Sequence, residues 1–358
     1  MPWPEILRAA REERVAELLY FNLKPYAEKI PVWIMKTLKR QYLLNLKRNL
    51  VLFHLLNPLL KTVSDFKIKA VLVKGGRLAE SVYQNPGLRP FWDLDFFVAS
   101  SHRKKMLSAL KESGCEFPNK TGFNPDAVCE NDINSTFRPV FRKGILEIEI
   151  HHSLPGLHLP LMHEEELWND TGELNIEGAP ARVLSLEYEL CALCLHAQQH
   201  SYSLLMWMVD IAEIASLSHL NWDRVLEICR REKISESVFY TLNLVNALWK
   251  ETVPEPALNR FWVSRPVIKM MQKMWPEERI TERRIREFPM HAPTFFSVLS
   301  KNNPLLIVRT VVKFVFPSKQ WLSYYYGISG VSWKLVRHYL WRLTHPVILT
   351  ARHLLRLD

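Results

Sequence analysis

The chain has 358 residues, of which 48% are apolar and only 11 are glycine. This apolar content is ample for a hydrophobic core, which excludes an extended or disordered protein. Leu, Arg, Lys and Glu recur through long stretches, which favours helix and predicts a mixed α and β chain with a smaller strand-bearing region. The formal net charge of +10 is uneven, because residues 301–358 hold nine Lys or Arg and a single acid, Asp358.

Residues 1–64 predict an N-terminal helical segment. Apolar residues recur there at helical spacing, and Pro25, Pro31 and Pro58 interrupt the pattern. Proline disfavours a helix interior, so several short helices are expected.

Residues 65–183 predict a small mixed sheet flanked by helices. The run KIKAVLVKGG indicates a strand that ends in a glycine turn and leads into a helix, and FWDLDFFVAS indicates a central strand followed by an amphipathic helix closed by Gly114. Residues 137–151 predict a hairpin, and a shorter strand pair is expected around ELNIEGAPARVL.

The rest of the chain has a helical pattern. Residues 184–300 predict a mainly α-helical domain, and residues 301–358 predict a basic, aromatic-rich helical region. The fold class is therefore α+β. The basic aromatic region is typical of a surface that binds RNA or an anionic membrane, although a solvated cationic face has the same composition.

Export signals and membrane spans are not expected. The first residues carry charges from Glu5 onward and contain no apolar signal core, and the run PLLIVRTVVKFVF is short and includes Arg309 and Lys313. Five cysteines, at positions 115, 129, 191, 194 and 229, form no disulfide framework. We expect a cytoplasmic protein, peripheral to the membrane where its basic region binds one, with Cys191 and Cys194 in the core and not on zinc.

Two acids in the central strand are the strongest candidate for catalysis. Residues two apart in a strand point the same way, so Asp93 and Asp95 present their carboxylates on one face, where they can share divalent cations such as Mg²⁺ or Mn²⁺. A neighbouring strand should supply a third acid. Glu147 and Glu149 both qualify, since they share a face with each other and with His151.

The glycine turn suggests a site for the phosphates of a nucleotide. Gly75 and Gly76 would offer backbone amides without side chains at the start of a helix. Lys74, Arg77 and Arg89 are basic residues that could bind a leaving pyrophosphate, and spacing does not choose among them.

A second polar group falls in the helical half of the chain. His196 and His200 lie four apart on one predicted helical face, with Asp210 further along. An i, i+4 histidine pair can bind zinc, but packing between helices is the preferred interpretation, with lining of an acceptor pocket as an alternative.

The order of KGG, YQNPGLRPFWDLDFFV and EIEIHHSL resembles an uncharacterised bacterial nucleotidyltransferase family within the DNA polymerase β-like superfamily. The resemblance covers nearly the whole chain, and the first sixty residues match only weakly. The third acid, usually Asp in this family, is Glu149 here. The family's motif residues fall on Lys74, Gly75, Tyr83, Arg89, Asp93, Asp95, Glu149 and His151.

This resemblance implies an activity. Two metal ions on Asp93, Asp95 and Glu149 would support transfer of NMP from an NTP to a hydroxyl-bearing acceptor, with release of pyrophosphate. It also implies a nucleotidyltransferase core over residues 65–183, and places His196, His200 and Asp210 at the cleft or in helix packing. The alternatives are a non-catalytic protein of this fold that binds RNA or an anionic membrane through residues 301–358, and a transferase for tRNA ends.

Overall fold

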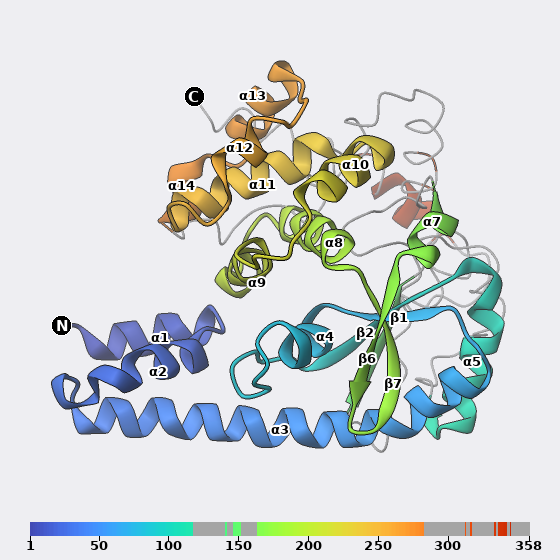
Figure 1. Cartoon of the computed structure of the whole chain (residues 1–358), viewed down its shortest axis with the longest axis horizontal. Helices are drawn as coiled ribbons and strands as arrows, with labels where there is room; N and C mark the ends of the chain where they lie inside the picture. Colours follow the sequence, from blue (N-terminus) through green and yellow to red (C-terminus); the bar gives the residue numbers. More distant parts are fainter. Residues whose placement is uncertain are drawn as a thin grey trace.

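The computed structural model describes residues 1–116, 140–141, 146–151 and 163–282, with residues 312, 316, 333, 336–341 and 344 beyond them. The expectations for Cys129 and for nearly all of the basic region 301–358 lie outside these residues. Figure 1 shows three parts in the described chain: the long helix α3 along one side, a twisted sheet in the middle, and helices α8 to α14 on the other side of the sheet.

The N-terminal part contains one long helix where short ones were expected. Its elements are α1 (Trp3–Glu12), α2 (Ala16–Leu23), the 3₁₀ helix η1 (Lys24–Lys29) and α3 (Val32–Asp65). Pro25 lies in the first turn of η1 and Pro31 caps α3, as expected, but Pro58 lies inside α3. The prediction of a break there was wrong, because an apolar stripe continues past the proline and packing overrides its cost. The buried residues of the stripe are Leu52, Phe53, Leu55, Leu56, Leu59, Leu60 and Val63.

The strands of the described residues form one mixed sheet of seven, in the order β3-β4-β5-β2-β1-β7-β6. Their bounds are β1 (Ala70–Val73), β2 (Asp93–Val98), β3 (Cys115–Glu116), β4 (Val140–Phe141), β5 (Leu146–His151), β6 (Thr171–Ile176) and β7 (Ala179–Leu184). The central strand β2 pairs antiparallel with β1 and parallel with β5. The predicted hairpin is present as β4–β5, and the predicted strand pair as β6–β7.

Helices cover both faces of the sheet. The helix α4 (Lys74–Ser81) follows β1, η2 (Ser100–His102) follows β2, α5 (Arg103–Glu112) follows η2, and α7 (Glu164–Asn169) precedes β6. Leu94 and Phe96 of β2 pack with α3 and α5 on one face, whereas Phe97 packs with α8 on the other. This alternation places the odd-numbered residues of β2, including both aspartates, on the face that looks toward α8.

The C-terminal helices form the second core. They are α8 (Leu186–Gln199), α9 (Leu205–Ala215), α10 (Trp222–Glu232), α11 (Ser235–Leu248), α12 (Glu255–Leu258), α13 (Arg265–Met274) and α14 (Glu277–Thr281). Ser185 caps α8 by accepting the backbone N–H of Tyr188, which satisfies one of the unpaired donors of the first turn. No helix among the described residues is long and apolar enough to cross a membrane. The mixed sheet and this helical half confirm the α+β fold class.

The cysteines of α8 are core residues. Cys191 and Cys194 are buried, and Sγ of Cys191 lies 3.8 Å from Sγ of Cys229 on α10. Burial raises the pKa of the Cys194 thiol, which disfavours the thiolate that a metal would need. The preference for packing over zinc at this CxxC is therefore supported by its surroundings.

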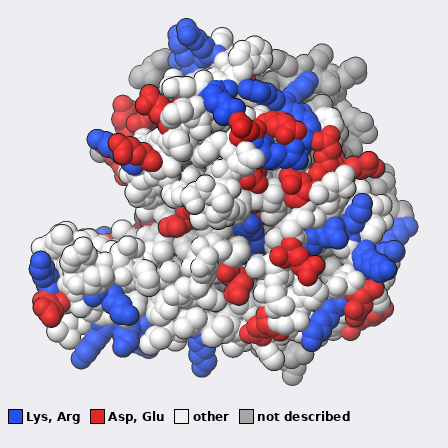
Figure 2. Space-filling model, in the orientation of Figure 1, with Lys and Arg blue, Asp and Glu red and all other residues white. Residues whose placement is uncertain are grey.

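Charged side chains are mixed in sign on the face shown in Figure 2, where Lys and Arg alternate with Asp and Glu over the upper helices and much of the middle of the face is uncharged. On this face the described chain therefore presents no continuous basic surface.

Candidate active site

Two asparagines of α3 hold the loop that leads into β2. Asn45 donates its side-chain N–H to the backbone oxygen of Gly87 at 2.9 Å, and Asn49 donates to that of Arg89 at 2.9 Å. Both asparagines are buried and lie four residues apart on one side of the helix. They satisfy backbone carbonyls that a buried loop would otherwise leave unpaired, and so fix the approach to Asp93. This role of Asn45 and Asn49 was not predicted from the sequence, although polar residues on an apolar helical stripe were a visible signal.

Arg89 is buried and pairs with Asp210 of α9. Its Nε and Nη2 donate to the Asp210 carboxylate at 2.8 and 2.6 Å, and Tyr83 donates its hydroxyl to the same carboxylate at 2.9 Å. Burial alone would lower the pKa of Arg89, but Asp210 outweighs it and raises that pKa. Arg89 therefore ties the loop to the helical half through its pairing with Asp210.

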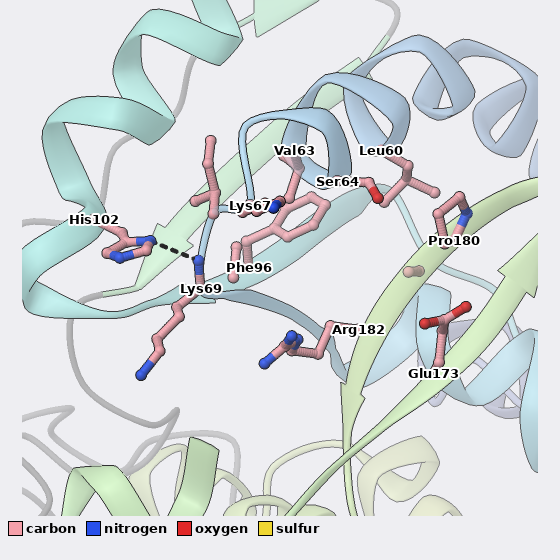
Figure 3. A pocket seen from close by; sticks show the side chains of 13 residues that line it. Leu60, Val63, Ser64, Lys67, Lys69, Phe96, His102, Glu173, Pro180 and Arg182 are labelled. Carbon is pink, nitrogen blue, oxygen red and sulfur yellow. Dashed lines mark hydrogen bonds between the residues drawn. The ribbon is translucent and has the colours of Figure 1, made fainter. Parts of the chain in front are cut away.

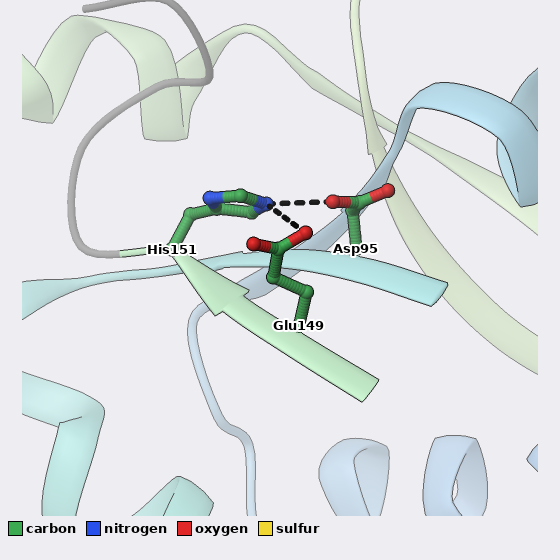
Figure 4. A group of neighbouring side chains, drawn as sticks. All are labelled: Asp95, Glu149 and His151. Atoms are coloured by element: carbon green, nitrogen blue, oxygen red, sulfur yellow. Dashed lines mark hydrogen bonds and ion pairs between the residues drawn. The ribbon is translucent and has the colours of Figure 1, made fainter. Parts of the chain in front are cut away.

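Asp95 and Glu149 lie at matching positions on the parallel strands β2 and β5, so their side chains share a face. Nε2 of His151 lies 2.6 Å from Oδ1 of Asp95 and 3.8 Å from Oε2 of Glu149 (Figure 4). One ligand atom from each of the three residues lies within 4.8 Å of the others. Two carboxylates and an imidazole at this spacing can hold one divalent cation.

The same register places Asp93 opposite Glu147. Asp93 is half-buried and Glu147 is exposed, one step along the strands from Asp95 and Glu149. Of the two glutamates that the sequence left open, Glu149 is thus the one that the fold brings together with Asp95 and His151.

Lys74 lies at the centre of this cluster. Its Nζ is 2.8 Å from Oδ1 of Asp95 and 3.3 Å from Nε2 of His151. Burial by itself would raise the pKa of Asp95, but Lys74 and His151 outweigh it and hold that pKa far below its ordinary value. Asp95 is consequently ionised throughout the neutral range, as a metal ligand must be.

The backbone at Lys74 adopts a strained, left-handed conformation. Its φ is +58°, a left-handed conformation that costs a residue other than glycine about 1–2 kcal/mol. The buried carboxylate of Glu189 on α8 accepts the Lys74 N–H at 2.9 Å and stabilises this conformation. Glu189 also lies 3.8 Å from Nε of Arg77, so that arginine is paired as well. The sequence signal for Glu189 was an acid inside an apolar helical run.

The two glycines of the turn are in the first turn of α4 and are buried. A Cβ on Gly75 would lie 2.7 Å from Cβ of Phe91, and one on Gly76 would collide with Cδ2 of Leu94. The lack of side chains at these two positions therefore lets the helix pack closely against the loop and β2. Their predicted contact with nucleotide phosphates stays a prediction.

The histidines of α8 form a ring cluster with Trp207 of α9. The centroids of His196 and His200 lie 4.7 Å apart, and each is 4.9 to 5.0 Å from Trp207. Burial lowers the pKa of His196 well below its ordinary value and that of His200 to about 4, with the charge of Lys74 acting in the same direction. Both imidazoles are thus neutral at pH 7 and pack beside the acid cluster, while Asp210 pairs with Arg89.

A pocket of about 320 Å³ lies on the opposite face of the sheet (Figure 3). Phe96 forms part of its wall, and Lys69 and Arg182 lie at its edge. Because Phe96 and Asp95 point to opposite faces of β2, this pocket is separate from the acid cluster.

A family of uncharacterised nucleotidyltransferases matches residues 1–250, which is most of the chain. The chain belongs to this family. The match includes the N-terminal helices, the sheet and α8 to α11, and it stops before the basic region 301–358, so the resemblance expected for that region lies outside it. No curated protein matches the sequence. A solved structure of an antigenic nucleotidyltransferase-like protein from Paracoccidioides brasiliensis is similar at 16% identity and a TM-score of 0.38, over 61% of this chain and 96% of that one.

Proposed function

We propose that this protein is a metal-dependent nucleotidyltransferase that moves NMP from an NTP to a hydroxyl-bearing acceptor and releases pyrophosphate. The observation that carries the proposal is the convergence of Asp95, Glu149 and His151 on one face of β2 and β5. Membership of the nucleotidyltransferase family supports the same reaction class.

The donor set fits a divalent cation. Carboxylate oxygens suit Mg²⁺ and Mn²⁺, and an imidazole is compatible with Mn²⁺. Lys74 already pairs with Asp95, so a metal would have to displace its ammonium group from that oxygen. Asp95, Glu149 and His151 would bind the metal, with Asp93 completing the set. When bound, it would stabilise the charge that develops on the transferred phosphoryl group and on pyrophosphate.

The chain's own residues have distinct tasks in this reaction. Asp95, or Glu149 beside it, would accept the proton of the acceptor hydroxyl, since both carboxylates lie in the cluster. In the metal-free protein, His151 holds Asp95 in position through its 2.6 Å contact. Lys74, once released from Asp95, would bind an oxygen of the departing pyrophosphate, because it directly follows Val73, the β1 residue that lies opposite Asp95.

Substitution of the strand acids tests the proposal. Asp93→Asn and Asp95→Asn should abolish NTP-dependent transfer, measured by mass spectrometry of a cell extract that is incubated with the protein, Mg²⁺ or Mn²⁺ and labelled NTP. Asp65→Asn, an exposed acid at the end of α3, is the matched control. Transfer at the wild-type rate in Asp95→Asn would refute the assignment.

A non-catalytic nucleotide-binding role is the second candidate, and the position of Lys74 favours it. An ammonium that pairs with Asp95 and His151 neutralises the cluster without any metal. Calorimetry separates the two functions: the enzyme should bind Mn²⁺ with NTP, whereas a protein that uses Lys74 in place of metal should bind NTP equally well in the presence of a chelator.

The proposal also includes the domain division, the location of the protein and the partner of its basic region. We retain the division into residues 1–64, 65–183, 184–300 and 301–358, a cytoplasmic location, and binding of RNA or anionic membrane by the basic region. A steep loss of RNA affinity at higher salt would support RNA, and selective binding to anionic vesicles would support lipid.

A further inference from the structure

Two guanidinium groups lie over the indole of Trp92, the residue directly before Asp93. Cζ of Arg14 and Cζ of Arg48 are each 4.3 Å from the centroid of the ring. Arg14 comes from the turn between α1 and α2, and Arg48 comes from the middle of α3. Two separate parts of the N-terminal segment therefore converge at the start of the strand that carries the catalytic acids.

Both arginines are held in place by their neighbours. Arg14 follows Glu13, whose carboxylate accepts the backbone N–H of Leu205 at 2.7 Å and ties this turn to the start of α9. Arg48 donates to the side chain of Asn45, which also holds the loop before β2. The arginine pair is thus part of the framework that positions Asp93.

The arginine pair differs from the other basic residues of the site in its carboxylate contacts. Those residues each have a carboxylate partner, in the pairs Lys74–Asp95, Arg77–Glu189 and Arg89–Asp210. Among the described residues, no carboxylate lies within 4.0 Å of Arg14 or Arg48. Asp93 acts on Arg14, and Glu17 on Arg48, only at longer range.

We propose that Arg14 and Arg48 bind the β- and γ-phosphates of the NTP, with Trp92 holding the two guanidinium groups together. This inference rests on the proposed function for the identity of the ligand. Planar guanidinium groups suit phosphate oxygens, which they bind through two parallel hydrogen bonds. A nucleobase is a poorer match, because the arginines already cover the Trp92 ring on which it would stack.

The position of the pair fits this task. Asp93 follows Trp92 directly, so phosphates bound by the arginines would lie next to the proposed metal ligands. When Asp93 binds metal, its charge no longer offsets that of Arg14, and the pair becomes a stronger anion site. The N-terminal helices would thus contribute to nucleotide binding as well as to the fold.

Calorimetry on the full chain tests the inference. The probes are an α,β-methylene NTP analogue and inorganic triphosphate, both with Mn²⁺, and an NMP. The variant Arg14→Gln/Arg48→Gln should bind both triphosphates at least about tenfold more weakly, since charge-assisted hydrogen bonds are lost, and the NMP almost unchanged. The control Arg11→Gln/Arg40→Gln removes the same charge from exposed positions of α1 and α3 and should behave like the wild type.

The outcomes separate this inference from the proposed function. Equal triphosphate affinity in the two double variants, or no triphosphate binding by the wild type, overturns the inference, even if the wild type transfers NMP. Triphosphate binding that depends on the arginine pair in a protein that transfers no NMP supports the inference and removes the proposed function. If the double variant does not fold, Arg14→Gln alone, at an exposed turn, decides by the same comparison.

Discussion

The ammonium group of Lys74 lies 2.8 Å from Oδ1 of Asp95, so the chain itself supplies a cation to its candidate metal site. Both side chains are nearly buried, at 13% and 5% exposure, which makes their interaction strong. A divalent metal on Asp95 must therefore compete with Lys74, and this competition gives the first prediction.

Lys74→Met should raise the affinity for Mn²⁺ and lower the stability of the metal-free protein. Without the ammonium, Asp95 is a buried carboxylate with only His151 to compensate it, and the free energy of unfolding should fall by roughly 3–5 kcal/mol. Mn²⁺ should restore most of that loss. Thermal melting with and without Mn²⁺ measures both effects, with Lys69→Met, exposed on the other side of the sheet, as the control. Unchanged Mn²⁺ affinity would show that Lys74 does not compete with metal.

The ion pair between Arg89 and Asp210 should be a main determinant of stability. Asp210→Ala leaves the buried guanidinium without its partner and should cost roughly 3–5 kcal/mol, measured by chemical denaturation. Glu213→Ala, an exposed acid on the same helix, should change stability by less than about 0.5 kcal/mol. Arg89→Lys should also be destabilising, because lysine cannot reproduce the paired hydrogen bonds. Equal stability of the Asp210 and Glu213 variants would contradict this assignment.

The glycines at the start of α4 should differ in their tolerance of alanine. Gly75→Ala meets Cβ of Phe91, which cannot move without its backbone, and should lose roughly 1–3 kcal/mol. Gly76→Ala meets the end of the Leu94 side chain, which can rotate, so its loss should be smaller. Gly172→Ala, where the nearest atom is 3.7 Å away, is the matched control. Denaturation midpoints in the order Gly75, Gly76, Gly172 from lowest to highest are expected, and a reversed order would exclude this packing role.

Stability should fall in mild acid because the unfolded chain protonates His200 and His196 more readily than the folded chain does. The pKa of His200 is about 4 in the folded chain, against about 6.5 when unfolded, so the unfolded chain binds the extra proton as the pH drops through this window. The free energy of unfolding should therefore be highest above pH 6.5 and should fall, by up to about 3 kcal/mol, as the pH drops toward 4. His200→Gln should reduce this dependence in denaturation curves at pH 7, 5.5 and 4 and leave the part that His196 contributes. An unchanged slope would mean that His200 titrates normally.

Much of the fold followed from local patterns. Alternation in FWDLDFFV predicted a strand with Asp93 and Asp95 on one face, and the glycines after KIKAVLV predicted the transition from β1 to α4. Such patterns are informative because each depends on a periodicity that burial imposes on neighbouring residues. The sequence motifs also indicated the family to which the chain belongs.

The arrangement of the site depended on contacts between distant segments. Glu147 and Glu149 have the same periodicity, and only the register of β5 against β2 brings Glu149 to Asp95. Arg89 meets Asp210 across 121 residues, and the backbone N–H of Lys74 donates to Glu189 across 115 residues while its ammonium group pairs with Asp95. The sequence pattern around each of these residues showed only that the residue is polar or basic. Their partners were decided when separate helices and strands packed together, since a buried charge must find its compensation in the tertiary structure.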